Sequence, residues 1–499
     1  NISYKWLLEY LPCTLSPQEI ADTLTSIGLE TGGVEEIETI RGGLRGLVIG
    51  HVLTCEEHPN SDHLHITTVD VGADAPLQIV CGAPNVAAGQ KVVVATVGTT
   101  LYHGEEEFAI KKSKIRGVES FGMICSEVEI GVGSSNDGII VLPSDAPVGM
   151  PAAEYYHVES DYCIEVDITP NRVDATSHYG VARDLAASLK RNGVPAELKL
   201  PEVNLPTDII DSRIEVKVAD ATACPRYQGL VIKGITVRES PEWLRNRLQA
   251  IGLRPINNIV DITNYVLHEF GQPLHAFDLA FIKGDQVHVQ TVAEGTPFVT
   301  LDGVERKLTA EDLMICDSNG DPMCVAGVFG GLHSGVTEKT KDIFLESANF
   351  NPTMVRRTAR RLGLNTDSSF RFERGLDPER TDWALRRAAS LILEIAGGRL
   401  GGMTDVYPNP LKPHQICLSF EKVNSVIGRT IEPETVRSIL DSLEIRISKE
   451  EDGVMTLEVP RYRTDVTRDV DVIEEIMRIY GYNQVELTGY IRASLGHET

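Results

Sequence analysis

The chain has 499 residues, of which 42% are apolar and 24% are charged, a composition that is typical of soluble globular domains and argues against a mainly disordered protein. At about 150 residues per domain, this length predicts three or four domains. The formal net charge is −25, from 47 basic and 72 acidic residues, so nucleic acid should bind only where basic residues gather locally.

The nine cysteines are scattered from Cys13 to Cys417 without a CxxC pair, which argues against a disulfide framework and against a structural zinc site. A reducing cytoplasm is therefore the expected location. No stretch approaches about 18 uncharged apolar residues, and the first residues carry charges, so membrane insertion and export are disfavoured.

The first predicted helix begins after Ser16, where Ser16, Pro17 and Glu19 form an N-terminal capping pattern, and it ends at Gly28. Short β-branched runs follow, separated by Gly, Pro and Asn turns: LVIGHVL, HITTVDV, LQIVCGA, KVVVATV and GIIVL. Strands at this spacing predict a small barrel of OB type over residues 41–151. Because a helical pattern resumes near Val181, we expect this barrel to be inserted in a small α/β first domain, residues 1–40 and 152–200.

The stretch from Pro195 to Pro206 is punctuated by prolines and predicts a linker. Residues 207–402 mix strand patterns such as YQGLVIKGI with helix patterns such as DWALRRAASLILEIAGG, which predicts a larger α+β domain. Residues 410–485 read as a small helical or winged domain with a hairpin through Gly453 and a last helix from about Val466 to Tyr480. Residues 486–499 form a tail. The fold class is therefore multidomain α+β.

Four strings mark the predicted barrel: HPNSDHL from His58, IVCGAPN from Ile79, SKIRGV from Ser113 and GMICSE from Gly122. His58, His63 and His65 could be metal ligands, but no cysteine accompanies them and two of them alternate along one strand. In order, the strings resemble the tRNA-binding OB domain that is attached to several synthetases. The basic residues of this region then become candidate phosphate contacts: Lys111, Lys112, Lys114 and Arg116. A second basic cluster, Arg356-Arg357 with Arg360-Arg361, lies outside these strings and, taken alone, is typical of a solvated surface.

Polar residues beside apolar ones recur in the central region, in DITNY from Asp261, GQPLHAFD from Gly271, GVFGG from Gly327, FLES from Phe344 and GLNTDSSFRFERG from Gly363. Each string alone is typical of a turn or of a hydrogen-bonded core group. Taken in order, and joined to the barrel and to DITPNRVD from Asp167, they resemble the bacterial phenylalanyl-tRNA synthetase β-subunit family.

The resemblance implies an editing domain, in which a second pocket hydrolyses tyrosine wrongly joined to tRNA(Phe). Its pocket residues map onto Glu346 as acceptor for the tyrosine hydroxyl, Gly330 as the space for the ring, His275 and Thr366 as groups that orient a water or the ester, and Thr263, Asn264 and Ala276 as further walls. Ser368 stands where many relatives have alanine. No nucleophile with a matching base is visible, so a positioned water is favoured over a covalent mechanism. His275 acts either as a general base or only to position water.

Physical limits explain why a second pocket is needed. A pocket that is shaped for phenylalanine rejects an analogue with one added hydroxyl by only about a hundredfold. A second pocket that offers a hydrogen-bond acceptor to that hydroxyl selects tyrosine instead and rejects phenylalanine. Bound phenylalanine would leave the acceptor desolvated and unpaired, at a cost of about 1–3 kcal/mol.

Four carboxylates gather in sequence near the predicted last helix: Asp465, Asp471, Glu474 and Glu475. The last three follow the i, i+3, i+4 spacing of one helix face. Such a set is either a solvated acidic face near a helix N-terminus or a site for a hard cation. The family resemblance favours the second, a Mg²⁺ site that is shared with the α subunit.

The resemblance also implies partners. These are the α subunit, which attaches phenylalanine to tRNA(Phe) with ATP, in an α2β2 heterotetramer, and tRNA(Phe) itself. A complete β subunit continues into a catalytic-like and an anticodon-binding domain, which this sequence lacks. Three hypotheses remain: an editing and assembly subunit of a ligase, a binding module with a decayed editing pocket, and a free-standing deacylase. The intact pocket residues argue against the second, and the barrel and acidic helix against the third.

Overall fold

The computed structural model describes residues 1–485, except residues 104–105, 134, 157 and 159. It contains two compact units: one consists of Asn1–Glu35 and the chain from Tyr162 onward, and the other of Glu36–Asp161. The class is mixed α and β, as predicted. The predicted tail, residues 486–499, lies outside the described residues.

The smaller unit is built on a sheet of order β11–β6–β3–β4–β5, with β12 also paired to β6. The Phe121 N–H donates to the Gln78 carbonyl over 2.9 Å, so the strand at one edge returns to the other and the sheet nearly closes into a barrel. Its strands are β3 (Leu47–Glu57), β4 (His65–Asp70), β5 (Leu77–Cys81), β6 (Lys91–Thr96), β11 (Gly122–Ile124) and β12 (Val141–Leu142).

Shorter elements complete the unit: the hairpins β7 (Thr100–His103) with β8 (Glu106–Ala109) and β9 (Ser113–Ile115) with β10 (Val118–Ser120), and the helices α3 (Glu127–Ile130) and α4 (Ala152–Tyr155).

The larger unit begins with a three-stranded sheet, β1 (Ile2–Ser3), β13 (Ser160–Val166) and β2 (Thr31–Glu38), and the helices α1 (Tyr4–Tyr10), α2 (Pro17–Ser26) and α5 (His178–Arg191). The capping pattern that starts α2 is confirmed, since the Ser16 hydroxyl accepts from the Glu19 N–H and the Glu19 carboxylate accepts from the Ser16 N–H. Trp6 stacks between His178 and Tyr265 and so ties α1 to α5 and to the central helices.

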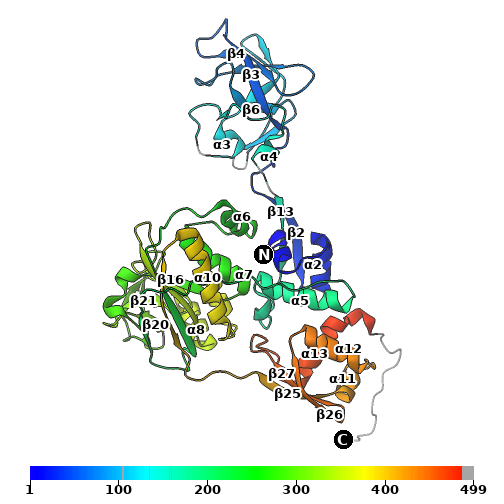
Figure 1. Ribbon diagram of the computed structural model, residues 1–499, viewed down its shortest axis with the longest axis vertical. Coiled ribbons are helices and arrows are strands. Elements are labelled where there is room, and N and C mark those ends of the chain that lie inside the picture. The colour runs from blue at the N-terminus through cyan, green and yellow to red at the C-terminus, as the bar shows by residue number, and fades with distance from the viewer. Residues whose placement is uncertain (104–105, 134, 157, 159, 486–499) are drawn as a thin grey trace, which may run out of the picture. The chain divides into compact units, whose positions relative to one another are not determined.

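Two sheets form the middle segment of this unit's chain, residues 215–406, which is the left-hand lobe in Figure 1. One is antiparallel, in the order β16 (Leu274–Asp278), β23 (Asp342–Asn349), β15 (Arg226–Lys233) and β24 (Arg399–Val406). The other runs β14 (Glu215–Val218), β17 (Gln286–Thr291), β20 (Leu313–Cys316), β21 (Pro322–Val325) and β22 (Phe329–Gly330). The helices of this region are α6 (Glu242–Ala250), α7 (Asn258–Phe270), α8 (Pro352–Leu362), α9 (Asp367–Phe372) and α10 (Arg380–Ala396), and a small hairpin joins β18 (Pro297–Val299) to β19 (Glu305–Lys307).

Side chains of the four-stranded sheet alternate between two cores, as the period of two in a strand requires. Ile343 and Leu345 of β23 belong to the core that contains residues of α7 and α10. Phe344 belongs to the core that is shared with the five-stranded sheet, α8 and α9. Glu346 is two residues from Phe344 and therefore points toward this second, largely apolar core.

The C-terminal part is α+β, and the predicted hairpin through Gly453 is formed by two of its strands, which are joined by a third strand that was not predicted. Its sheet has the order β25 (His414–Ser419), β27 (Val454–Val459) and β26 (Arg446–Glu451), and its helices are α11 (Phe420–Ile427), α12 (Pro433–Ser442) and α13 (Asp469–Tyr480). The missed strand β25 shows the strand period, with Ile416 and Leu418 buried. Helix α13 begins later than predicted because Arg468, the N-cap, has extended backbone angles.

Among the described residues, no helix combines the length and apolar composition that a membrane span requires.

Candidate functional site

A cavity of about 340 Å³ opens in the central region of the larger unit. Its walls come from α7, β16, β22, β23 and the start of α9. The structure brings all seven residues of the predicted editing pocket to this cavity: Thr263, Asn264, His275, Ala276, Gly330, Glu346 and Thr366. Ser368 also lines it. This volume is of the size that small-molecule sites have.

Strand pairing places His275 beside Glu346. The two residues are direct partners in the antiparallel register of β16 and β23, and Phe277 is likewise opposite Phe344. Side chains of such partners lie on the same face of a sheet. The imidazole and the carboxyl group are therefore neighbours on the face that bears the aromatic core.

Glu346 is a buried carboxyl group, 6% exposed, among apolar residues. Burial raises the pKa of Glu346 to about 8, although a hydrogen bond from Tyr227 acts in the opposite direction. The Tyr227 hydroxyl donates to Glu346 Oε2 over 2.8 Å. No hydrogen bond to Oε1 is found within the described residues, so this oxygen is available to a ligand.

No sequence motif pointed to Tyr227, which belongs to the strand pattern YQGLVIKGI. In the register of β15 and β23, Tyr227 is opposite Ala348, two residues from Glu346, and so lies diagonally across from the carboxyl group. Tyr227 is fully buried. Only the pairing of two strands that are distant in sequence reveals this contact.

His275 presents an unpaired nitrogen at the cavity. Burial lowers the pKa of His275 to about 4, so the imidazole is neutral at pH 7. Within the described residues its Nε2 is buried and has no hydrogen-bond partner. Gly330 lies against the ring, because a Cβ added there would be 3.0 Å from His275 Cε1 and 3.5 Å from Nε2. A side chain at position 330 would therefore occupy the space in front of this nitrogen.

The hydroxyl groups of the two threonines that line the cavity form hydrogen bonds within the protein. Thr366 Oγ1 donates to the Val328 carbonyl over 2.8 Å and accepts from the Ser369 N–H over 3.0 Å, as the N-cap of α9. Thr263 Oγ1 donates to the Val260 carbonyl over 2.7 Å. The geometry therefore makes Thr366 a residue that shapes the wall. Among the described residues, Glu346 Oε1, the Asn264 amide and His275 Nε2 remain as cavity groups for which no hydrogen bond is found.

The four basic residues that were predicted to contact tRNA are exposed on the smaller unit, on or next to β9. Lys112 forms an ion pair with Glu119 at 3.0 Å and lies over the Phe121 ring. Arg116 donates to the Asn60 carbonyl over 3.1 Å. Lys111 lines a cavity of about 910 Å³ in the same unit. His58 Nε2 lies 3.2 Å from the Ile115 carbonyl oxygen, within hydrogen-bonding distance.

The four carboxylates that were predicted to bind Mg²⁺ do not converge. Asp471 caps the start of α13 and pairs with Arg468, and Glu474 is exposed. Glu475 is buried between Arg463 and Arg478, with contacts of 2.7 Å to each. Asp465 accepts from the Asn171 amide over 2.9 Å.

Two of the four carboxylates are thus already neutralised by arginines. Among the described residues, no group of three or more His, Cys, Asp or Glu side chains is arranged to hold a metal ion. A Mg²⁺ ion with its oxygen ligands does not fit this set as it stands.

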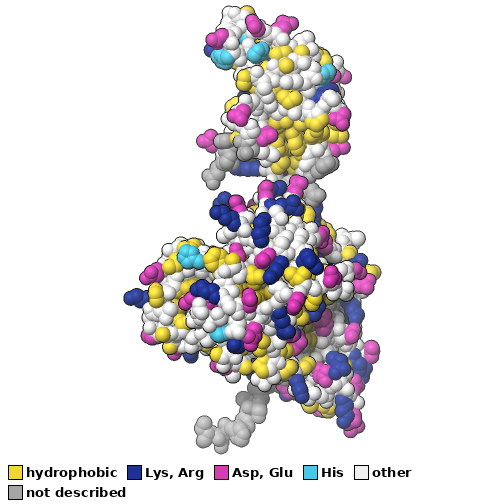
Figure 2. All heavy atoms as spheres, turned by 60° about the vertical axis from the view of Figure 1, so that its left-hand side comes forward, with side chains coloured by type: hydrophobic (Ala, Val, Ile, Leu, Met, Phe, Trp, Pro, Cys, Tyr) yellow, Lys and Arg dark blue, Asp and Glu magenta, His cyan; other side chains and the backbone are white. Residues whose placement is uncertain are grey.

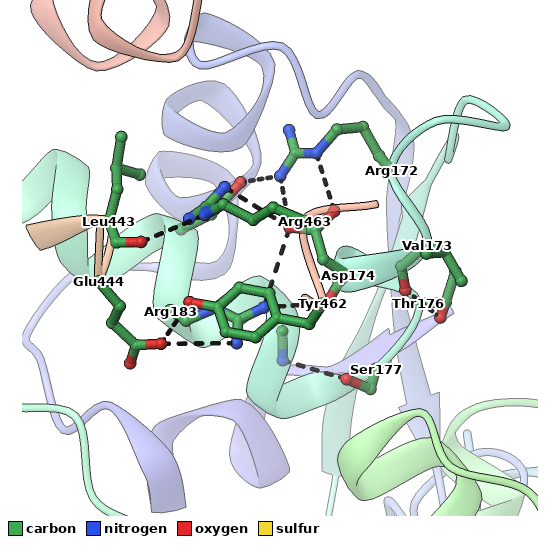
Figure 3. A network of polar contacts seen from close by, with 12 residues as sticks. Arg172, Val173, Asp174, Thr176, Ser177, Arg183, Leu443, Glu444, Tyr462 and Arg463 are labelled. Atoms are coloured by element: carbon green, nitrogen blue, oxygen red, sulfur yellow. Dashed lines mark hydrogen bonds and ion pairs between the residues drawn. The ribbon is translucent and has the colours of Figure 1, made fainter. Parts of the chain in front are cut away.

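Glu475 belongs instead to a buried charge network that joins α5 and its preceding loop to α13. Arg478 donates to Asp184 over 2.9 Å, and Arg172 donates to Asp174 over 3.0 and 3.1 Å. Figure 3 shows the neighbouring part of this network, in which Arg463 approaches Asp174, and Glu444 contacts both Arg183 and Tyr462. The buried members are four arginines and three carboxylates: Arg172, Arg183, Arg463, Arg478, Asp174, Asp184 and Glu475.

Comparison with known families finds three domains in the chain. The B3/4 domain family matches residues 223–397, the family described as "Putative tRNA binding domain" matches residues 47–151, and the tRNA synthetase B5 domain family matches residues 416–482. Every residue that lines the cavity falls within the first of these ranges.

Whole-chain relatives share one description, phenylalanine–tRNA ligase beta subunit. The sequence is 98% identical over 499 residues to the protein of Porphyromonas gingivalis (strain ATCC BAA-308 / W83), covering 100% of this chain and 61% of that protein. It is 63% identical to the protein of Bacteroides fragilis (strain YCH46) and 62% identical to that of Bacteroides thetaiotaomicron, covering 99% of this chain and 60% of each relative. The chain therefore spans about three-fifths of the length of the curated relatives it matches.

Among solved structures, an N-terminal fragment of the phenylalanyl-tRNA synthetase β subunit from Pyrococcus horikoshii is 16% identical, with a TM-score of 0.34, covering 64% of this chain and 87% of that one.

Proposed function

The chain belongs to the phenylalanine–tRNA ligase beta subunit family, and from this premise we propose that its central cavity hydrolyses tyrosine from mischarged tRNA(Phe). The observation that carries the proposal is the convergence of Glu346, His275, Gly330 and four further predicted residues on one cavity. A buried carboxyl group in an apolar pocket is suited to recognise a phenol hydroxyl.

Selection of tyrosine rests on Glu346. Tyr227 occupies Oε2, which leaves Oε1 to form a hydrogen bond with the hydroxyl of a tyrosine substrate. Phenylalanine has no hydroxyl, and its binding leaves this oxygen desolvated and unpaired, at a cost of about 1–3 kcal/mol. Gly330 leaves room for the ring, because any side chain there meets Leu301 and His275.

Hydrolysis uses a water molecule. Water adds to the ester carbonyl carbon, the bond to the terminal ribose oxygen breaks, and the proton passes to that oxygen, which yields tyrosine and uncharged tRNA. With a pKa of about 4, His275 is a weak base at neutral pH, so we assign it the orientation of the water or ester through Nε2 rather than proton abstraction. Thr366 acts by holding the start of α9 in the wall.

The remaining roles are proposed from the family. The barrel contacts tRNA(Phe) through Lys111, Lys112, Lys114 and Arg116, whose exposed cations suit a phosphate backbone. The whole enzyme pairs this subunit with an α subunit, as an α2β2 heterotetramer in the cytoplasm, and the α subunit attaches phenylalanine with ATP and Mg²⁺. No step of the editing reaction proposed above runs through a metal ion.

The test compares hydrolysis of tyrosyl-tRNA(Phe) and phenylalanyl-tRNA(Phe) by the chain and by a His275→Ala variant. We expect the chain to release tyrosine preferentially, and the variant to lose most of this rate while its affinity for tRNA is unchanged. If a folded chain that binds tRNA released no tyrosine, the second candidate function would be favoured: an RNA-binding module, supported by the match to a tRNA-binding domain and by the exposed lysines.

A further inference from the structure

Helix α8 carries a row of arginines that the proposed function leaves unused. Its sequence is PTMVRRTARRL, and Arg356, Arg357 and Arg360 are exposed, as is Arg361. The apolar face is the opposite one, since Val355 and Ala359 are buried in the core that α8 shares with the five-stranded sheet. The helix is thus sharply divided into a buried apolar side and a cationic outer side.

Three of these arginines have no acidic partner among the described residues. Arg361 pairs with the buried Asp312 and donates to the Lys307 carbonyl, so it has a structural role. No hydrogen bond or ion pair of the Arg356, Arg357 or Arg360 side chains is found within the described part of the chain. Like charges four residues apart, such as Arg356 and Arg360, repel each other along a helix.

The helix dipole accounts for arginines in the last turn of α8, Arg360 and Arg361. It does not account for Arg356 and Arg357 in the middle of the helix. Over the face that Figure 2 shows, basic and acidic side chains of the larger unit are intermixed. In a chain with a net charge of −25, three neighbouring cations that have no carboxylate partner within the described part of the chain therefore suit an anionic partner.

The helix lies directly behind the cavity. Gly327 lines the cavity, and a Cβ added to it would be 3.2 Å from Val355 Cγ2 of α8. Only four residues separate Arg361 from Thr366, which also lines the cavity. Because consecutive Cα atoms are ~3.8 Å apart, the end of α8 is within about 19 Å of that wall.

We propose that the arginine face of α8, formed by Arg356, Arg357 and Arg360, binds the phosphate backbone at the acceptor end of the tRNA whose aminoacyl ester enters the cavity. The proposal rests on the proposed function and adds an RNA contact on the larger unit to those of the barrel. Arginine suits this role, because its planar guanidinium donates to two phosphate oxygens at once.

The test uses the whole chain and a triple variant, Arg356→Gln, Arg357→Gln and Arg360→Gln, in which Arg361 is kept because of its pair with Asp312. Glutamine has a helix propensity close to that of arginine. A matched control, Lys412→Gln with Arg446→Gln and Lys449→Gln, removes the same charge from exposed positions in the C-terminal part. Circular dichroism of both variants verifies the fold.

We expect the α8 variant to bind tRNA(Phe) at least tenfold more weakly at ~0.1 M salt. The slope of log K against log salt should be reduced by about 2–3, since each of three lost phosphate contacts removes ~0.7–0.9 from the slope. Its kcat/KM for tyrosyl-tRNA(Phe) should fall at least tenfold. Hydrolysis of a 3′-tyrosyl adenosine ester, which has no phosphate, should be unchanged, and lysines at the three positions should restore the slope.

An α8 variant whose tRNA affinity and salt slope match those of the control variant would overturn this proposal. Failure of the unsubstituted chain to hydrolyse either substrate would instead overturn the proposed function. The binding comparison decides the role of the α8 surface in either case, because it does not depend on hydrolysis.

Discussion

Glu346 combines burial, a raised pKa and one hydrogen bond in a way that a pH titration can detect. Its ordinary pKa is 4.5, and burial raises it to about 8. Between these values the unfolded chain has lost a proton that the folded chain keeps. The contribution of Glu346 to stability is therefore full below pH ~4.5 and is lost as the pH rises through about 8, with a slope of at most ~1.4 kcal/mol per pH unit.

This gives the first prediction. In urea denaturation between pH 5 and 8, the stability of the unsubstituted chain should fall relative to that of Glu346→Gln as the pH rises, because glutamine does not titrate. Glu474→Gln, at an exposed position, serves as the control and should show no such trend. A stability difference between Glu346→Gln and the unsubstituted chain that stays constant over this range would contradict the raised pKa.

A second prediction concerns Tyr227. Tyr227→Phe removes the only donor that the described structure gives to the Glu346 carboxyl, so we expect a loss of ~1–3 kcal/mol in the free energy of unfolding. The pKa of Glu346 should rise further, because the lost bond lowers it at present. Tyr155→Phe in the smaller unit is the control. An unchanged denaturation midpoint for Tyr227→Phe would show that the contact is not formed.

Family resemblance assigned residues to the cavity one by one, and the structure brings those seven residues together. It could not assign Tyr227, because a hydrogen bond between residues 119 positions apart is set by strand register. Nor could it show that the Thr366 hydroxyl donates to the Val328 carbonyl and accepts a hydrogen bond as the N-cap of α9. Those facts come from geometry rather than from residue type.

At the scale of elements, the sequence predicts a helix start correctly where the hydrogen bonds that fix it join residues close in sequence. The capping box of Ser16 and Glu19 predicts the start of α2, because its two reciprocal hydrogen bonds lie within four residues of the sequence. Helix α13 was predicted to start too early, because its start depends on the extended backbone of Arg468 and on the hydrogen bond that the Arg468 N–H donates to the Asp471 carboxylate. Strand β25 was missed although its alternation is visible, because its six residues directly precede a helical pattern.

Gly330, in the short strand β22, provides the third prediction. Gly330→Ala places a Cβ 3.0 Å from both His275 Cε1 and Leu301 Cδ1, so the cavity should narrow in front of the imidazole. We expect at least a tenfold lower rate of tyrosine release with little change in the melting temperature. Gly335→Ala is the control, since it also lines the cavity but its nearest neighbour would be at 3.7 Å. Equal rates for the two variants would contradict the close approach at Gly330.

At the scale of the whole larger unit, the charge network joins segments that are almost 300 residues apart, as in the contact of Arg478 with Asp184. No local pattern predicts such a contact. Burial acts to raise the pKa of Glu475, but Arg478 and Arg463 outweigh it and lower that pKa. The acidic helix face, which was predicted to bind Mg²⁺, therefore contributes one of its carboxylates to a structural core.

The fourth prediction follows from this arrangement. Glu475→Gln leaves four buried arginines with two buried carboxylates, so we expect a loss of about 3–5 kcal/mol in the free energy of unfolding. The loss should be the same in Mg²⁺ and in EDTA. Glu474→Gln, one residue away and exposed, should have little effect. A loss that appears only in Mg²⁺ would contradict the structural role and favour a metal site.

The central claim, that Glu346 recognises the tyrosine hydroxyl, is tested most directly by a cycle of four rates: the unsubstituted chain and Glu346→Ala, each acting on tyrosyl-tRNA(Phe) and phenylalanyl-tRNA(Phe). The account predicts that the substitution lowers kcat/KM for the tyrosyl ester at least tenfold more than for the phenylalanyl ester, because only the former uses Oε1. An equal decrease in kcat/KM for both esters would mean that Glu346 maintains the shape of the cavity but does not recognise the tyrosine hydroxyl, and would contradict the claim.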